Sequence, residues 1–167
     1  DGVYHSADGG ETWRHLGELG ETPFHGDIHG LALRRSRSGD AELLATTPYG
    51  LATSTDRGDS WSWRSFDGFD KGSGNPYAYC RGIFVAPDDP DTMLVGCGDY
   101  IPGRTGAIEV SHDGGATWER PMLPATPNST VYWMATHPGL PGRVVAATVF
   151  GQVFTSEDAG QIGRAHV

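Results

Sequence analysis

The chain repeats one eight-residue pattern, Ser-x-Asp-x-Gly-x-Thr/Ser-Trp, at residues 6–13, 54–61 and 111–118. A fourth copy begins at Ser156 and departs from the pattern after Gly160. Internal repetition constrains the fold strongly, because each copy is one supersecondary unit that cannot bury its apolar face alone. The sequence therefore predicts a stack of similar units, and it predicts this architecture more sharply than any function.

A β-hairpin is expected around each copy. Short alternating runs such as residues 107–110 lead into the pattern and are typical of strands. The Asp-x-Gly core favours a turn, because Asp side chains bind nearby backbone amides and Gly accepts positive φ. Repeated identity implies a repeated structural role, so we expect the carboxylates to hold turns and not to catalyse. The residues expected to clasp the hairpins are Ser6, Asp8, Gly10, Trp13, Ser54, Asp56, Gly58, Trp61, Ser111, Asp113, Gly115, Trp118, Ser156 and Asp158.

Two further strands are expected between successive copies, which gives four strands per unit at a spacing of about fifty residues. The predicted fold is all-β: a partial β-propeller of four-stranded antiparallel blades over residues 1–160. Two complete blades are expected at about 28–66 and 80–123, with incomplete blades at both ends. Residues 161–167 continue no repeat and resemble a translated sequencing adapter, so we expect them to be a non-native tail.

The repeated pattern resembles the Asp-box, or bacterial neuraminidase repeat, of β-propellers. Such boxes occur in sialidases, some glucan-cleaving glycoside hydrolases, sortilin-type receptors and photosystem assembly factors. The resemblance implies a propeller with the box as a structural clasp, and it does not discriminate among those families. Sialidases also carry an Arg-Ile-Pro segment, which this chain lacks, and an arginine cluster, to which Arg81 and Arg104 could belong.

Composition limits the partners. The formal net charge of −9 argues against nucleic acid and anionic membranes, because both need a positive protein face. We expect a carbohydrate, another small molecule or a peptide as ligand, with neutral or cationic ligands favoured, and no cofactor. No stretch is long and apolar enough to span a membrane. The Gly- and Trp-rich, Lys-poor composition fits an extracellular or periplasmic protein.

Function is expected where the repeats differ, at the strand ends opposite the boxes. Five of the six tyrosines fall in the loops assigned to that face, where aromatic rings suit a sugar or another small ring. Aligning the innermost strands places His29, Arg81 and Trp133 at equivalent positions, two residues after Asp27, Tyr79 and Val131. The predicted ligand-binding residues are His29, Tyr79, Arg81, Tyr100, Arg104 and Trp133.

Acid–base and metal chemistry have fewer candidates. Asp27, Asp67 and Asp99 are candidate general acids or bases, provided that burial raises their pKa. His25, Asp27 and His29 alternate, so a strand would place all three on one face as possible metal ligands.

The two cysteines, Cys80 and Cys97, are expected almost opposite each other on neighbouring antiparallel strands. A disulfide and a pair of buried free thiols are both open interpretations.

Three function hypotheses follow. The first is a glycan- or peptide-binding propeller, and the second is a glycoside hydrolase, sialidase-like or glucan-cleaving, whose carboxylates flank a bound sugar. The third is a non-enzymatic assembly factor or receptor scaffold.

Overall fold

The computed structural model describes residues 2–17, 19–20, 23–69, 76–160 and 164–166. Most of these residues lie in strands or in the turns that join them, because short runs of alternating apolar and polar residues are separated by Gly-rich turns throughout the chain. The elements are β1 (Val3–His5), β2 (Arg14–Leu16), the 3-10 helix η1 (Pro23–Gly26), β3 (Gly30–Arg35), β4 (Ala41–Thr47), β5 (Gly50–Ser54), β6 (Ser62–Arg64), β7 (Tyr79–Val85), β8 (Met93–Gly98), β9 (Gly106–Ser111), β10 (Val131–Thr136), β11 (Val144–Thr148), β12 (Val153–Ser156) and β13 (Arg164–His166).

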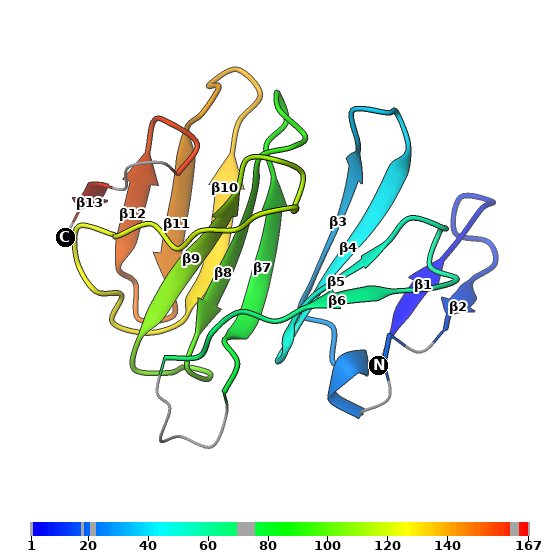
Figure 1. Ribbon diagram of the computed structural model, residues 1–167, viewed down its shortest axis with the longest axis horizontal. Coiled ribbons are helices and arrows are strands. Elements are labelled where there is room, and N and C mark those ends of the chain that lie inside the picture. The colour runs from blue at the N-terminus through cyan, green and yellow to red at the C-terminus, as the bar shows by residue number, and fades with distance from the viewer. Residues whose placement is uncertain (1, 18, 21–22, 70–75, 161–163, 167) are drawn as a thin grey trace.

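The strands form antiparallel meanders that stand side by side (Figure 1). Two sheets have four strands, in the orders β3-β4-β5-β6 and β10-β11-β12-β13, and a third has the order β7-β8-β9. Main-chain bonds between Val110 and Glu119 extend the third sheet by a bridge to a fourth segment. Strands β1 and β2 form a separate hairpin. The predicted all-β partial propeller is therefore confirmed.

The last strand lies within the residues expected to be a non-native tail. Arg164–His166 pairs with β12 and forms the edge of the β10–β13 sheet, whereas residues 161–163 and 167 lie outside the described residues. The pairing gives these residues a place in the fold, and their exclusion from the native sequence remains a prediction.

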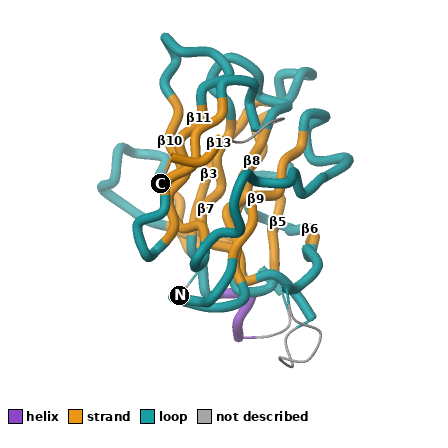
Figure 2. The backbone as a smooth tube through the Cα atoms, turned by 90° about the vertical axis from the view of Figure 1, so that its left-hand side faces the viewer, coloured by secondary structure: helices purple, strands orange, loops and turns teal. Residues whose placement is uncertain are grey.

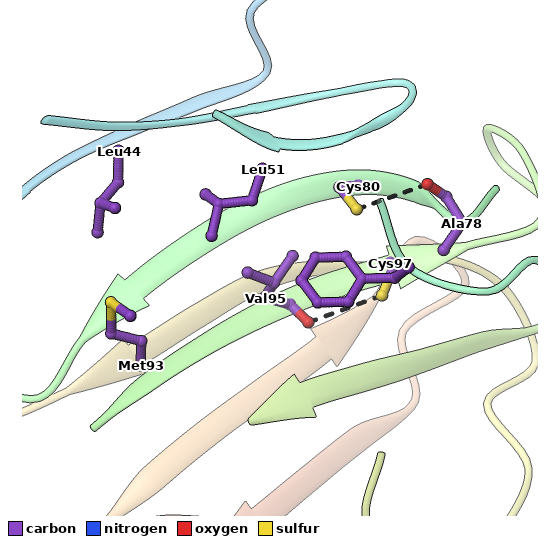
Figure 3. Packing of buried hydrophobic residues seen from close by; sticks show 8 residues of the cluster. Leu44, Leu51, Ala78, Cys80, Met93, Val95 and Cys97 are labelled. Atoms are coloured by element: carbon purple, nitrogen blue, oxygen red, sulfur yellow. Dashed lines mark hydrogen bonds between the residues drawn. The ribbon is translucent and has the colours of Figure 1, made fainter. Parts of the chain in front are cut away.

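The innermost strands β3, β7 and β10 are neighbours, and small residues permit their close approach. A Cβ at Gly30 would lie 2.8 Å from the carbonyl oxygen of Arg81, and one at Gly82 would lie 3.2 Å from that of Tyr132. Each glycine thus marks the same position in successive blades. Side chains between the sheets form separate apolar clusters, one of which fills the space between the β3–β6 and β7–β9 sheets (Figure 3).

Cys80 and Cys97 lie within this cluster as direct cross-strand partners of β7 and β8. Both are buried free thiols, which realises one of the two interpretations left open by the sequence. Each thiol points to a main-chain oxygen, Cys80 to Ala78 and Cys97 to Val95 (Figure 3). The hydrogen bond with Cys80, together with burial, raises the pKa of the Cys97 thiol well above its ordinary value. Both sulfurs therefore act as core groups.

In Figure 2 the single short helix among the described residues, η1, lies at one end of the strands. None of the described helical residues forms a span long and apolar enough to cross a bilayer.

Candidate functional site

The strand ends divide the molecule into two chemically different regions. We call the end that carries the repeated turns the box end. The opposite end, which we call the axial end, holds the starts of β3, β7 and β10 and lies at the bottom of Figure 1, near η1.

The box end repeats one hydrogen-bond pattern. In the first box, Ser6 Oγ donates to Asp8 Oδ1 at 2.7 Å and accepts from the Gly10 amide at 2.7 Å, while the Thr12 amide donates to Asp8 Oδ1 at 2.9 Å. The corresponding distances are 2.8, 2.8 and 2.8 Å in the second box, and 2.9, 2.8 and 2.8 Å in the third. The fourth box keeps the serine bonds, with Ser156 Oγ 2.5 Å from Asp158 Oδ1. These bonds close each turn on itself.

The same bonds stabilise the charged form of the box carboxylates. The hydroxyl of Ser60, with its amide, lowers the pKa of Asp56 to about 2, and Thr117 does the same for Asp113. Thr12 holds the pKa of Asp8 lower still. Carboxylates that are ionised and fully occupied as turn acceptors are poorly suited to proton transfer.

At the axial end, unlike side chains from β7, from β10 and from the residue before β3 meet. We call His29, Tyr79, Arg81 and Tyr132 the axial cluster. His29 Nδ1 lies 2.6 Å from the Cys80 carbonyl oxygen, and His29 Nε2 lies 3.3 Å from the Tyr79 hydroxyl. Arg81 Nη1 donates to the Tyr79 hydroxyl at 3.4 Å, and Arg81 Nη2 donates to the Tyr132 hydroxyl. Three blades therefore share one hydrogen-bonded network.

The partners fix the direction of these bonds. Because the Cys80 carbonyl can only accept, His29 Nδ1 carries the proton and a neutral His29 accepts at Nε2. Burial is the largest influence and lowers the pKa of His29 below 6.5, against the raising effect of the hydrogen bond with the Cys80 carbonyl, and the lowered pKa favours this neutral form. Tyr79 then donates to His29 and accepts from Arg81, and burial raises the pKa of Tyr79. Donation thus runs from Arg81 through Tyr79 to His29.

The register of the strands corrects the predicted alignment. In each blade, the ladders align the box serine with one residue of the innermost strand. Counting four residues back along the chain from that residue gives His29, Arg81 and Tyr132, so Tyr132, and not Trp133, is equivalent to His29 and Arg81. Register shifts lie close to both positions, between Cys80 and Ile83 in β7 and between Val131 and Trp133 in β10. Such bulges add a residue and re-aim side chains, and an ungapped comparison of the sequence does not show them, so the sequence alignment missed Tyr132.

Exposed rings flank the axial cluster on two sides. Tyr100 is 65% exposed, and its ring centroid lies 5.7 Å from that of Tyr79. Trp133 is 57% exposed and lies 4.2 Å from the Tyr132 ring. Two exposed aromatic faces beside buried hydrogen-bonding groups form a surface that suits a ring-shaped ligand.

The candidate acids have different surroundings. Asp27 lies against the cluster, with Oδ2 3.4 Å from His29 Nε2 and a side chain 52% exposed. Asp99 Oδ1 instead accepts from the amides of Arg104 and Thr105, at 2.8 and 3.3 Å, and so shapes the β8–β9 loop. The Arg104 side chain is 82% exposed, and its Nε lies 3.6 Å from Asp99 Oδ2.

Asp67 belongs to a different contact. Its main-chain oxygen accepts from Arg120 Nη2 at 2.6 Å, and Arg120 also pairs with the buried Glu109 at 2.7 Å through Nε. Burial raises the pKa of Glu109. The sequence did not point to Glu109 as a buried acid, because Glu109 occupies an ordinary alternating position of a strand.

The expected metal ligands do not converge. The segment before Gly30 is not a strand: His25 belongs to η1, and its ring packs 4.2 Å from that of Trp63. Only Asp27 and His29 remain together. Within the described ranges no three His, Cys, Asp or Glu side chains form a group that could hold a metal ion.

Comparison with known proteins agrees with this fold. The BNR/Asp-box repeat family matches residues 4–15 and 109–120, so the chain carries BNR/Asp-box repeats. It is 46% identical over 57 residues to a probable oligoxyloglucan-reducing end-specific xyloglucanase of Neosartorya fischeri. That match covers 33% of this chain and 7% of the relative.

Solved structures show the same architecture at low identity. An ancestral GH74 enzyme has a TM-score of 0.74 at 19% identity, and the match covers 99% of this chain and 21% of that one. The GH74 enzyme of Niastella koreensis also scores 0.74, at 15% identity, over 99% of this chain and 26% of that one. YCF48 of Cyanidioschyzon merolae scores 0.59 at 17% identity, over 87% and 41%. The chain therefore spans less than half the length of each of these relatives.

Proposed function

We propose that this chain is part of a β-propeller that binds a glycan at the axial end. The observation that carries the proposal is the convergence of His29, Arg81 and Tyr132, three unlike side chains at equivalent positions of adjacent blades. A repeated architecture supplies identical turns by default, so unlike residues brought together at one point indicate a specific site.

The chemistry of the site favours a sugar. Exposed faces of Tyr100 and Trp133 offer stacking area, while the axial cluster and Asp27 offer donors and acceptors for hydroxyl groups. The partial identity to a probable xyloglucanase and the fold shared with GH74 enzymes support a carbohydrate ligand.

Binding fits the described residues better than hydrolysis. Glycoside hydrolysis ordinarily uses two carboxyl groups on either side of the bond that breaks. Asp27 is the one candidate that contacts the axial cluster, because Asp99 binds loop amides and Asp67 adjoins Arg120. Hydrolysis is the second candidate function, with Asp27 as one carboxylate and its counterpart supplied from beyond these residues.

A peptide ligand is a third possibility, supported by the similarity to YCF48, which has been solved bound to a D1 peptide (TM-score 0.55, 17% identity, 83% of this chain and 40% of that one). The expected extracellular or periplasmic location remains a prediction.

A glycan array and a reducing-sugar assay on the natural protein that contains this chain test the proposal together. We expect glycan binding that Tyr100→Ala and Trp133→Ala each weaken by about 1 kcal/mol or more. Release of reducing ends that Asp27→Asn abolishes would establish hydrolysis instead. Binding of peptides and of no glycan would contradict the proposal.

A further inference from the structure

The arginines that reach into the structure differ in what neutralises them. The buried Arg34 donates through Nε to Glu42 at 2.6 Å and through Nη1 to Asp91 at 3.4 Å. Arg120 pairs with Glu109. Arg81 is half-buried and hydrogen-bonds two phenol hydroxyls, and no described carboxylate lies within ion-pair distance of it.

Phenol rings compensate this charge only in part. The Arg81 Cζ atom lies 4.4 Å from the centre of the Tyr132 ring and 5.8 Å from that of Tyr79, which gives cation–π stabilisation. Its Nε is buried and has no hydrogen-bond partner among the described residues. A partly buried charge that no described carboxylate contacts directly is unfavourable, so a ligand that supplies an anion gains more here than at the solvated surface.

The direction of the hydrogen bonds strengthens this point. Arg81 is the first donor of the network, because Tyr79 accepts a hydrogen bond from Arg81 and donates its own O–H to His29. Tyr132 accepts from Arg81, so its O–H remains available to donate. A guanidinium and a phenol O–H side by side present donors to a single acceptor-rich group.

We propose that the axial site recognises a glycan that carries a carboxylate, as in a uronic acid, with the carboxylate bound by Arg81 and Tyr132. This inference rests on the proposed glycan function and names the class of sugar. One guanidinium balances one negative charge, and the formal net charge of −9 together with the adjacent Asp27 disfavours a phosphate dianion. The overall charge of the chain favours neutral or cationic ligands, but at this one position we expect a group with a single negative charge.

Calorimetric titration of the natural protein with trigalacturonic acid and with its fully methyl-esterified form tests the inference. The ester keeps the sugar rings, removes the charge and adds one methyl group to each carboxyl group. We expect the acid to bind at least about tenfold more tightly than the ester. Arg81→Gln is expected to abolish this preference, and Arg81→Lys to reduce it because ammonium lacks the planar fork.

Matched variants separate recognition from folding. Tyr132→Phe removes one hydroxyl and keeps the ring, so it should weaken binding of the acid and leave the ester unchanged. Tyr4→Phe and Arg143→Gln, at exposed positions outside the axial cluster, should change neither. Near-ultraviolet circular dichroism of each variant reports whether its folded packing is retained.

The outcomes are distinct. A preference for the acid that depends on both Arg81 and Tyr132 supports the inference. Equal affinity for acid and ester, or equal losses for both in folded Arg81 and Tyr132 variants, overturns it and leaves the glycan function standing. Failure to bind either compound or any neutral glycan overturns both proposals.

Discussion

At the box end, turns built from the same residues repeat the same hydrogen bonds, with Ser Oγ to Asp Oδ1 distances of 2.7, 2.8 and 2.9 Å. At the axial end, the equivalent positions hold His29, Arg81 and Tyr132: Arg81 bonds to Tyr132 directly and to His29 through the Tyr79 hydroxyl. The serine and aspartate hydrogen bonds of each box close within one turn, whereas the hydrogen bonds of the axial cluster join neighbouring blades. From this difference we propose that the box end contributes stability and the axial end contributes recognition.

The largest effect on stability is expected from Gly58→Ala in the second box. Gly58 has φ +89°, and an added Cβ would lie 2.5 Å from Cδ1 of the buried Leu16. Strained backbone and overpacking together should cost about 2–3 kcal/mol, measured by denaturant unfolding of the natural protein. Glycan affinity of the folded fraction should not change.

Gly39→Ala is the matched control for that experiment. Gly39 has φ +91°, and no atom lies within 4 Å of an added Cβ, so it reports the backbone cost alone. Equal losses at both positions would show that the packing of Leu16 against the box is unimportant.

The box carboxylates predict a loss of stability in acid. Asp56 and Asp113 have folded pKa values of about 2, below the ordinary 3.8. Their contribution is present above pH 3.8 and is lost as the pH falls towards 2, because unfolding then takes up protons. Urea titrations between pH 5 and 2 should show this slope, which Asp56→Asn reduces. If Asp56→Asn left the pH dependence of stability unchanged, the hydrogen bonds of the box would not favour the ionised form of Asp56.

His29 predicts a separate and smaller effect near neutral pH. Its folded pKa lies below 6.5, so the folded state binds fewer protons than the unfolded chain below that value, and stability should decline as the pH falls from about 6.5. His29→Gln should remove this decline in stability near neutral pH and leave unchanged the loss of stability below pH 3.8 that the box carboxylates cause. NMR titration of His29 with a pKa at or above 6.5 would contradict the buried, neutral assignment.

The smallest effect is expected from Arg57→Gly. Arg57 has φ +64° at the box position where the first and third boxes have Gly9 and Gly114, at +74° and +73°. A residue with a Cβ is strained in this region, so glycine should stabilise the protein by up to about 1 kcal/mol. A lower melting temperature in the variant would show that the Arg57 side chain contributes more than its backbone costs.

Repetition made the box end predictable from sequence, because every copy carries the residues that its turn requires. The axial end depends on register, which the sequence does not display. Bulges before Ile83 and Trp133 placed Tyr132 beside Arg81, and η1 removed His25 from the strand on which alternation had placed it. Asp99 looked like a free acid because the amides that it binds belong to its own loop.

The most direct test compares two exposed tryptophans. Trp13 in the first box is 63% exposed and Trp133 at the axial end is 57% exposed, so alanine removes a similar ring from each end. Glycan affinity of the natural protein should fall by about 1 kcal/mol or more in Trp133→Ala and stay unchanged in Trp13→Ala. Loss of binding in Trp13→Ala, with Trp133→Ala unaffected and both variants folded, would contradict the assignment of recognition to the axial end.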